Sequence, residues 1–371
     1  MKDLIGMKIT NVETYLLDVP LRQRAITDSQ TKLDSVEFVA VRLDTDDGIS
    51  GWGFNWNYTK GTRAVQAIID DTYAEKLMGK DPLMYKNVLR ELHYTNHFIG
   101  QVGITRVALC AVELALWDIK LKVANMPLWK YLGPVKDKVK AYNTDGGWLE
   151  VTTDELVKDM TALVERGFDA VKMKIGLPNP REDYERVKAV RKAIGDDIKL
   201  MVDANTVWDL KTSIVWGRKL EEFDIYWLEE PMNPFDKKSH AELASRLDVP
   251  IAIGETVYTK YDFRDYIEMG GVSIVQADAT KLSGIDEWLD VAALARCYNL
   301  EVIPHTNVQQ KLHVQLAAAT SNVPMVEYCY ESIIDIWENP IKVENGYYSL
   351  PEEPGLGCKL TDKILTECRI G

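Results

Sequence analysis

After residue 138 the chain has a regular texture that leaves few folds open. Short apolar segments of strand type alternate there with amphipathic helical segments, as is typical of parallel β/α units. We predict eight strands, at residues 138–144, 168–175, 198–203, 224–229, 250–255, 272–277, 300–305 and 323–327. Helices are expected between them, for example at 153–166, 183–194, 210–223, 283–298 and 308–320. Eight strands fit an α/β barrel better than an open doubly wound sheet, which usually has fewer.

The first part of the chain has a different pattern. Residues 8–19 and 35–55 alternate apolar and polar side chains, and the second run is interrupted at 45–48 by Thr-Asp-Asp-Gly, a hairpin signal. Helical patterns follow at 62–78, 84–92 and 104–123. We therefore predict an N-terminal α+β capping domain over residues 1–135, completed by the turn-rich residues 340–371, and a barrel domain over residues 136–339.

Charge and composition exclude several classes of function. The chain has 44 basic and 57 acidic residues, a net charge of −13, and no basic cluster, so nucleic acid and anionic membranes are poor partners. No apolar run approaches the roughly 20 residues of a membrane span, and the first residues lack a signal-peptide core, so we expect a cytoplasmic protein. Five scattered cysteines without Cys-x-x-Cys spacing argue against disulfides or zinc. No glycine-rich nucleotide motif follows the first strand.

Ionisable residues occupy the predicted carboxyl ends of the barrel strands, where barrel enzymes hold their catalytic groups. They recur about once per β/α unit, and we call them the rim residues: Lys172, Lys174, Asp203, Glu229, Glu255, Asp278, His305 and Glu327. Every strand after the first therefore brings an ionisable group to the same end of the barrel.

Lys172 and Lys174 lie two residues apart in an apolar strand, so both side chains point to one face. Proximity of two ammonium groups and partial burial both lower a lysine pKa from about 10.4, and a lysine with a lowered pKa can act as a general base. The alternative is an edge strand with two solvated lysines.

Asp203, Glu229 and Glu255 are carboxylates on three consecutive strands. Without a counterion they would repel one another and be costly to bury. A set of oxygen ligands without His or Cys favours Mg²⁺. The alternative is that some of them pair with Lys172 or Lys174, or cap the following helix.

His305 ends a predicted strand, and Asp278 ends the strand before it. A carboxylate in this place can orient the imidazole and stabilise its charged form. The alternative is a packed histidine bonded to a backbone group. His93 and His97 are spaced i, i+4, but without a third ligand nearby we interpret them as ordinary residues.

At this point the chain resembles the enolase superfamily, and specifically its mandelate racemase subgroup. The similarity includes the segments 108–118 and 127–133, the Lys-x-Lys strand, the acidic trio and the Asp/His pair. Muconate-cycloisomerase-like relatives carry a second lysine at the end of the sixth strand, where this chain has Asp278, with Lys281 three residues later. The resemblance implies a modified (β/α)7β barrel of the TIM type. It also implies the known chemistry of that superfamily, in which a Lys or His base acts together with Mg²⁺ that stabilises an enediolate.

The resemblance implies abstraction of the proton α to a carboxylate. Mg²⁺ on the acidic trio would hold the carboxylate, Lys172 would add positive charge, and Lys174 and His305 would face opposite sides of the α-carbon. Glu327 would either donate a proton to a carboxylate oxygen or accept a hydrogen bond from a nearby cation. With a 3-hydroxyl on the substrate, His305 could protonate it so that water leaves.

Polar residues in the expected lid loops favour a polyhydroxylated substrate over an aryl one. We predict substrate-binding roles for Arg24, Asn55, Trp56 and Asn205, although solvated arginines are common on surfaces. The preferred function is an acid-sugar dehydratase that forms a 2-keto-3-deoxy acid, in a homo-oligomer. The alternatives are a racemase, epimerase or cycloisomerase with the same site, or a barrel without catalytic activity.

Overall fold

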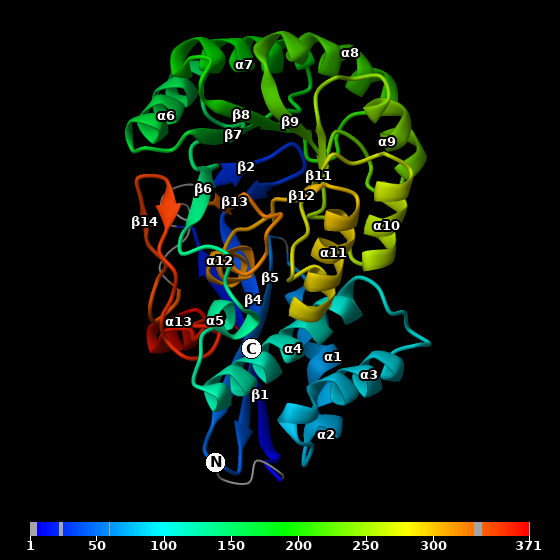
Figure 1. The fold of residues 1–371 in the computed structure, drawn as a ribbon, viewed down its shortest axis with the longest axis vertical. Helices are drawn as coiled ribbons and strands as arrows, with labels where there is room; N and C mark the ends of the chain where they lie inside the picture. Colours follow the sequence, from blue (N-terminus) through cyan, green and yellow to red (C-terminus); the bar gives the residue numbers. More distant parts are fainter. Residues whose placement is uncertain (1–5, 22–24, 59, 330–335, 371) are drawn as a thin grey trace.

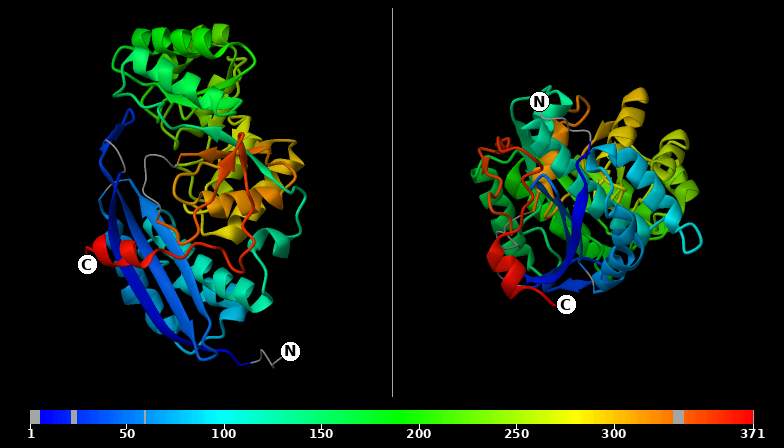
Figure 2. Two further views of the ribbon diagram at one scale, coloured as in Figure 1. Left: turned by 90° about the vertical axis from the view of Figure 1, so that its left-hand side faces the viewer. Right: turned by 90° about the horizontal axis from the view of Figure 1, so that it is seen from below.

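The structure, a computed structural model, describes residues 6–21, 25–58, 60–329 and 336–370. Its N-terminal part contains a three-stranded antiparallel sheet in the order β1-β4-β5, and the predicted hairpin joins the last two strands. The strands are β1 (Ile9–Pro20), β4 (Ser35–Thr45) and β5 (Ser50–Asn57). A small hairpin, β2 (Ile26–Thr27) with β3 (Lys32–Leu33), extends from this sheet towards the barrel (Figure 2).

Helices lie on one face of this sheet, either directly against it or packed on the long helix that covers it (Figure 1). They are α1 (Thr62–Ile68), α2 (Ala74–Leu77), α3 (Tyr85–Thr95), α4 (Ile104–Ala124) and α5 (Leu128–Leu132), with a π-helical turn at Ile69–Tyr73 and a 3₁₀ turn at Pro82–Met84. Helix α4 lies unusually close to β5. A Cβ atom at Gly53 would lie 1.9 Å from the carbonyl oxygen of Ala111, so the approach requires glycine at that position.

Within the described residues, the second part contains eight parallel strands and seven intervening helices, which confirms the predicted (β/α)7β order. The strands are β6 (Val139–Asn143), β7 (Ala170–Lys174), β8 (Lys199–Asp203), β9 (Ile225–Glu229), β10 (Ile251–Ile253), β11 (Ile274–Val275), β12 (Glu301–Val302) and β13 (Met325–Tyr328). The helices are α6 (Thr153–Glu165), α7 (Pro180–Ile194), α8 (Leu210–Leu220), α9 (Lys237–Ala244), α10 (Lys260–Glu268), α11 (Ile285–Cys297) and α12 (Gln310–Ala318), with a 3₁₀ turn at Glu221–Phe223. Adjacent strands pair in sequence from β6 to β12, and β13 pairs with β6.

The barrel interior is filled in layers. One buried apolar residue from each strand, or from the position directly after it, forms a separate cluster: Tyr142, Ala170, Met201, Trp227, Ala252, Ile274, Ile303 and Met325. Side chains in a strand alternate between two faces, so the residues two positions further on also face inward. These include Lys172, Asp203, Glu229, His305 and Glu327. A layer of charged residues therefore lies directly above an apolar plug.

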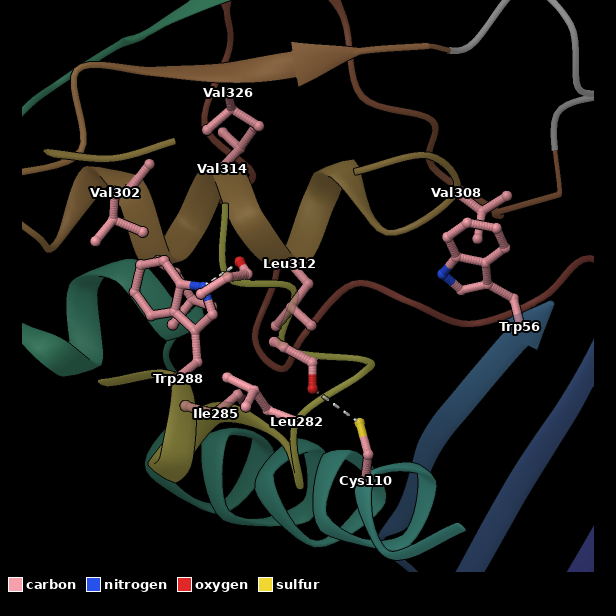
Figure 3. Close-up of a cluster of buried hydrophobic side chains, with 14 of the residues drawn as sticks. Trp56, Cys110, Leu282, Ile285, Trp288, Val302, Val308, Leu312, Val314 and Val326 are labelled. Atoms are coloured by element: carbon pink, nitrogen blue, oxygen red, sulfur yellow. Dashed lines mark hydrogen bonds between the residues drawn. The ribbon is translucent and has the colours of Figure 1, made fainter. Parts of the chain in front are cut away.

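A second apolar cluster, between the barrel and the N-terminal part, anchors the segment around Asp278 (Figure 3). The indole nitrogen of Trp288 in α11 donates to the carbonyl of Ala277 at 2.8 Å. The thiol of Cys110 in α4 donates to the carbonyl of Ala279 at 3.3 Å. Both neighbours of Asp278 are thus held by buried side chains.

The C-terminal segment contacts both parts of the molecule. Strand β14 (Val343–Glu344) pairs with β15 (Tyr347–Tyr348), and β15 pairs antiparallel with β6 of the barrel. Helix α13 (Asp362–Glu367) lies beside the N-terminal sheet (Figure 2), where the Cys368 carbonyl accepts from the N–H of Asp18 at 2.8 Å. The domain limits at residues 135 and 340 stay a prediction. Among the helices of the described ranges, none is both long and apolar enough to cross a membrane.

Candidate active site

The three predicted metal-binding carboxylates come together at the ends of β8, β9 and β10. One oxygen from each of Asp203, Glu229 and Glu255 can be chosen so that all three lie within 4.8 Å of one another. Asp203 and Glu229 are fully buried, whereas the side chain of Glu255 is 20% exposed. Three converging oxygen donors with one open side fit Mg²⁺, which prefers oxygen ligands and usually keeps positions for water and substrate.

Lys172 lies between two carboxylates of the rim. Its Nζ is 2.7 Å from Oε1 of Glu229 and 2.9 Å from Oε1 of Glu327. Burial alone would lower the pKa of Lys172, but these two carboxylates outweigh it and raise the pKa well above its ordinary value. Lys172 is therefore a fixed positive charge rather than a proton carrier.

Lys174 occupies the next position on the same face of β7. Its Nζ is 2.5 Å from Oδ2 of Asp203, and the ammonium lies 5.6 Å from the centre of the Trp148 ring. Burial lowers the pKa of Lys174, but the Asp203 charge outweighs both burial and the Lys172 charge, so the pKa is raised. The predicted lowering of the lysine pKa is wrong for this arrangement, because each ammonium lies within 3 Å of a carboxylate oxygen.

His305 and Asp278 form the predicted pair. Nδ1 of His305 is 3.0 Å from Oδ2 of Asp278, and Nε2 is 3.2 Å from Oε2 of Glu255. Burial raises the pKa of Asp278, but the hydrogen bond from His305 and nearby positive charge outweigh it and hold the pKa at about 2. Burial lowers the pKa of His305, but the Glu255 and Asp278 carboxylates raise it to about 9. His305 is therefore an imidazolium at neutral pH in this arrangement.

Glu327 accepts hydrogen bonds rather than donating one. Its Oε1 faces Lys172, and its Oε2 accepts from the N–H of Thr306 at 2.9 Å. Burial raises the pKa of Glu327, but the Lys172 charge outweighs it and lowers the pKa. Of the two roles considered for Glu327, the geometry favours the acceptor.

Strand β5 brings Asn55 and Trp56 against the barrel, where the two side chains have different surroundings. The Trp56 indole stacks on the His305 ring, with ring centres 6.0 Å apart and planes at 24°. Asn55 is fully buried; its Nδ2 donates to the carbonyl of Thr280 at 2.5 Å, and its Oδ1 accepts from the N–H of Trp56 at 2.7 Å. Through these bonds the Asn55 amide links the N-terminal part to the loop after β11. The predicted contact of Asn55 with substrate is therefore not supported.

Asn205 lies two residues after Asp203 and has a left-handed backbone conformation, with φ of 43°. Its Nδ2 donates to Oε1 of Glu255 at 3.3 Å, and its backbone carbonyl accepts from Gln30 at 2.7 Å. Asn205 therefore links a carboxylate of the trio to the β2–β3 hairpin. Arg24, the fourth predicted substrate-binding residue, lies outside the described residues.

Sequence reasoning missed two residues that contact the site. Trp148, in the loop after β6, packs over the ammonium of Lys174. Gln309 donates to Oδ2 of Asp278 at 2.8 Å. The only signal for Trp148 was its position just after the first barrel strand, where loops form the rim. No sequence pattern pointed to Gln309, because a glutamine near the start of a predicted helix is common and its distance from His305 along the chain matches no known motif.

Two family models match this chain. Residues 155–364 match the model described as "Enolase C-terminal domain-like", and residues 11–133 match the N-terminal domain of mandelate racemase and muconate lactonizing enzyme. The chain belongs to the enolase superfamily. Within the superfamily it is similar to acid-sugar dehydratases and racemases of the mandelate racemase group.

Similar proteins cover nearly the whole chain of this superfamily member. The L-talarate/galactarate dehydratase of Salmonella typhimurium is 34% identical, with 96% of this chain and 90% of that protein covered. The 3,6-anhydro-alpha-L-galactonate cycloisomerase of Streptomyces coelicolor is 31% identical, with 98% and 100% covered.

A crystal structure of the Salmonella typhimurium dehydratase, liganded with Mg and L-lyxarohydroxamate, superposes with a TM-score of 0.93 at 31% identity. It covers 100% of this chain and 95% of that chain. The chain is thus an enzyme of a Mg²⁺-dependent superfamily, and its acidic trio offers the oxygen donors that this ion requires.

Proposed function

We propose that the protein is a Mg²⁺-dependent dehydratase that converts an acid sugar, an aldonate or an aldarate, into a 2-keto-3-deoxy acid. The observation that carries the proposal is the placement of a lysine and a carboxylate-bound histidine on opposite sides of the acidic trio. In sheet order, Lys174 lies at the end of β7, the trio follows on β8, β9 and β10, and His305 follows β12. A substrate carboxylate held at the trio would therefore place its α-carbon between the two.

The charge of His305 favours elimination over racemisation. Nδ1 of His305 lies 3.0 Å from Oδ2 of Asp278, and this carboxylate stabilises the charged form of the imidazole, which can donate a proton to a leaving hydroxyl. A racemase would instead need His305 as a base for one of its two substrate enantiomers. Asp203, Glu229 and Glu255 would hold Mg²⁺, which would supply positive charge to the carboxylate on which the second negative charge develops and would offset the Asp203 charge that keeps Lys174 protonated.

Lys174, as the neutral amine, removes the proton from C2, and the electrons of the broken C–H bond move into the carboxylate as an enediolate. Lys172 lies within the same charged layer and stabilises that negative charge, since Glu229 and Glu327 hold its ammonium in place. His305 then donates its proton to the 3-hydroxyl, the C3–O bond breaks and water leaves. The resulting enol tautomerises to the 2-keto acid, so that atoms and charge balance without a further reactant.

Relatives support the class of substrate. The Salmonella typhimurium relative is named for talarate and galactarate, which are diacid sugars, and this chain is similar to it over 96% of its length. Polar groups from the β2–β3 hairpin, such as Ser29 and Gln30, lie against the strand end that carries Asp203. A hydroxylated chain can form hydrogen bonds with such a surface, whereas an aryl group cannot.

A cycloisomerase is the second candidate, because the Streptomyces coelicolor relative carries that activity in its name. It would use the same abstraction of the α-proton but expel a ring oxygen instead of water. Both reactions need an acid opposite Lys174, so His305 has the same place in each.

The test is a screen of mono- and diacid sugars with the Mg²⁺-loaded enzyme, with semicarbazide to detect the keto acid. Dehydration predicts keto acid from at least one acid sugar and none from the same reaction with His305→Asn. Parallel incubations in D₂O report the alternative: deuterium in recovered substrate without keto acid would refute dehydration. Anhydro sugar acids in the same screen detect ring opening.

A further inference from the structure

We propose that Gln309 is a positioning residue for the Asp278–His305 pair. Its side-chain amide fixes the carboxylate oxygen to which His305 is bonded, and so holds the imidazolium where it can donate to the leaving group. The proposal rests on the proposed function, in which His305 is the acid. It assigns a role to a residue outside the rim.

Gln309 is fully buried and directly precedes α12. Its Nε2 donates to Oδ2 of Asp278 at 2.8 Å, and its Oε1 accepts from the backbone N–H of Asn307 at 3.1 Å. The N–H of Asn307 can only donate, and an ionised carboxylate can only accept. These two partners therefore fix the orientation of the amide without ambiguity.

With Gln309 in place, each oxygen of the Asp278 carboxylate accepts two hydrogen bonds. Oδ1 of Asp278 accepts from the N–H and the hydroxyl of Thr280, both at 2.7 Å. Oδ2 accepts from Gln309 at 2.8 Å and from His305 at 3.0 Å. Rotation of the carboxylate would break several of these bonds at once, so Asp278 and the ring that it holds are fixed.

Gln309 also affects the chemistry of the oxygen that it shares with His305. A second donor on Oδ2 withdraws electron density from that oxygen, so the carboxylate pulls less strongly on the Nδ1 proton. The strength of the Nδ1 hydrogen bond therefore reports whether Gln309 is bonded to Oδ2.

The test compares Gln309→Met with Gln315→Met. Gln315 is equally buried, lies in α12, and its Nε2 bonds to two backbone carbonyls, those of Lys311 at 3.2 Å and Leu356 at 3.0 Å. A methionine at either site removes buried hydrogen bonds, but only the first change reaches Asp278. We expect Gln309→Met to lower kcat for keto acid formation about tenfold, or about 1.4 kcal/mol, with KM nearly unchanged. Gln315→Met should leave kcat unchanged.

A spectroscopic signature separates positioning from simple destabilisation. In Mg²⁺-loaded enzyme with ¹⁵N-labelled histidine, the Nδ1 proton resonance of His305 is the one lost in His305→Asn. It should move downfield in Gln309→Met, because Oδ2 then has a single donor and bonds it more strongly. In Gln315→Met it should stay in place.

Three results would overturn the proposal: equal losses of kcat in both variants, a loss of kcat in Gln309→Met with no movement of the resonance, or a moved resonance with unchanged kcat. Failure of the proposed function would give a result different from these three. The wild-type enzyme would then form no keto acid from any acid sugar, and the resonance alone would decide whether Gln309 positions the pair.

Discussion

Replacing Asp278 by asparagine tests the assignment of His305 as the acid. All the donors around this side chain are matched to a carboxylate, since Thr280, Gln309 and His305 each direct N–H or O–H groups at it. An asparagine offers one oxygen and one NH₂. If the NH₂ faces His305, the imidazole must take the tautomer with a bare Nδ1, and if it faces Thr280, it meets a backbone N–H that cannot turn away.

The magnitude follows from the pKa of His305. It is about 9 in the structure, against an ordinary value near 6.5, a difference worth about 3 kcal/mol of stabilisation of the imidazolium. The protonated fraction at pH 8 is then about 0.9, and it would fall to about 0.03 if the pKa returned fully to about 6.5. Glu255, the larger cause of the raised pKa, remains in Asp278→Asn. We therefore expect this variant to lower kcat at pH 8 by up to about thirtyfold through the lost proton, and by less at pH 6.

The assay is kcat for keto acid formation between pH 5.5 and 10, with Mg²⁺ saturating at each pH. The sign is fixed by the role: an acid is active while protonated, so the rate declines as pH rises through its pKa. In Asp278→Asn that decline should begin at lower pH than in the wild type. A decline at the wild-type position, with only a uniform loss of rate, would refute the link between Asp278 and the proton affinity of His305.

Three further predictions test other parts of the structure. Lys174→Met should slow deuterium exchange at the α-carbon at least about a hundredfold, and near-normal exchange would mean that another group is the base. EDTA should abolish keto acid formation, and Mg²⁺ should raise the Tm of the apoenzyme but not that of Glu229→Gln to the same extent. Gly53→Ala should cost at least about 1–3 kcal/mol in urea unfolding, because its Cβ would overlap the carbonyl of Ala111. An unchanged midpoint would contradict that packing.

The order of elements was predictable because their periodicity is local. Seven of the eight barrel strands fall within their predicted segments, β13 ends one residue beyond its segment, and the long helix predicted at 104–123 is observed at Ile104–Ala124. Strands β11 and β12 are much shorter than predicted. The apolar pattern there extends beyond the assigned strands into buried residues such as Ala277 and Ile303. The backbone N–H of Ile303 still donates to the carbonyl of Val275 at 2.9 Å, so the pairing continues past the end of β12.

Positions on the rim were predictable, but partners were not. Spacing of about one β/α unit places Asp203, Glu229 and His305 at one end of the barrel, because strand ends in a parallel barrel meet there. The spacing does not reveal which carboxylate oxygen a lysine faces. The distance from Nζ to that oxygen determines whether the pKa of Lys174 is raised or lowered. Asn55 shows the same limit: a polar residue near the end of a strand suggests a loop ligand, although tertiary packing buries its amide against Thr280.

The charges of the rim residues themselves indicate why a divalent ion belongs in this barrel. Lys172, Lys174 and His305 are held in their positive forms by their surroundings. With the five rim carboxylates ionised, three positive and five negative charges leave a net charge of −2 above an apolar plug, where unbalanced charge is costly. The excess of negative charge is visible at Glu229. Burial and the neighbouring Asp203 charge raise the pKa of Glu229 to about 7.

A dication neutralises that excess and favours the ionised form of Glu229, whereas a substrate anion alone would increase it. Burial and the nearby Glu255 raise the pKa of the buried Glu230 well above its ordinary value, which favours its neutral form. The order of assembly follows from the same balance: the cation must bind before the site can hold a carboxylate. Chelation should therefore abolish substrate binding as well as turnover, and calorimetric titration of the EDTA-treated enzyme with a substrate from the screen would measure it. Unchanged affinity without the ion would refute this order.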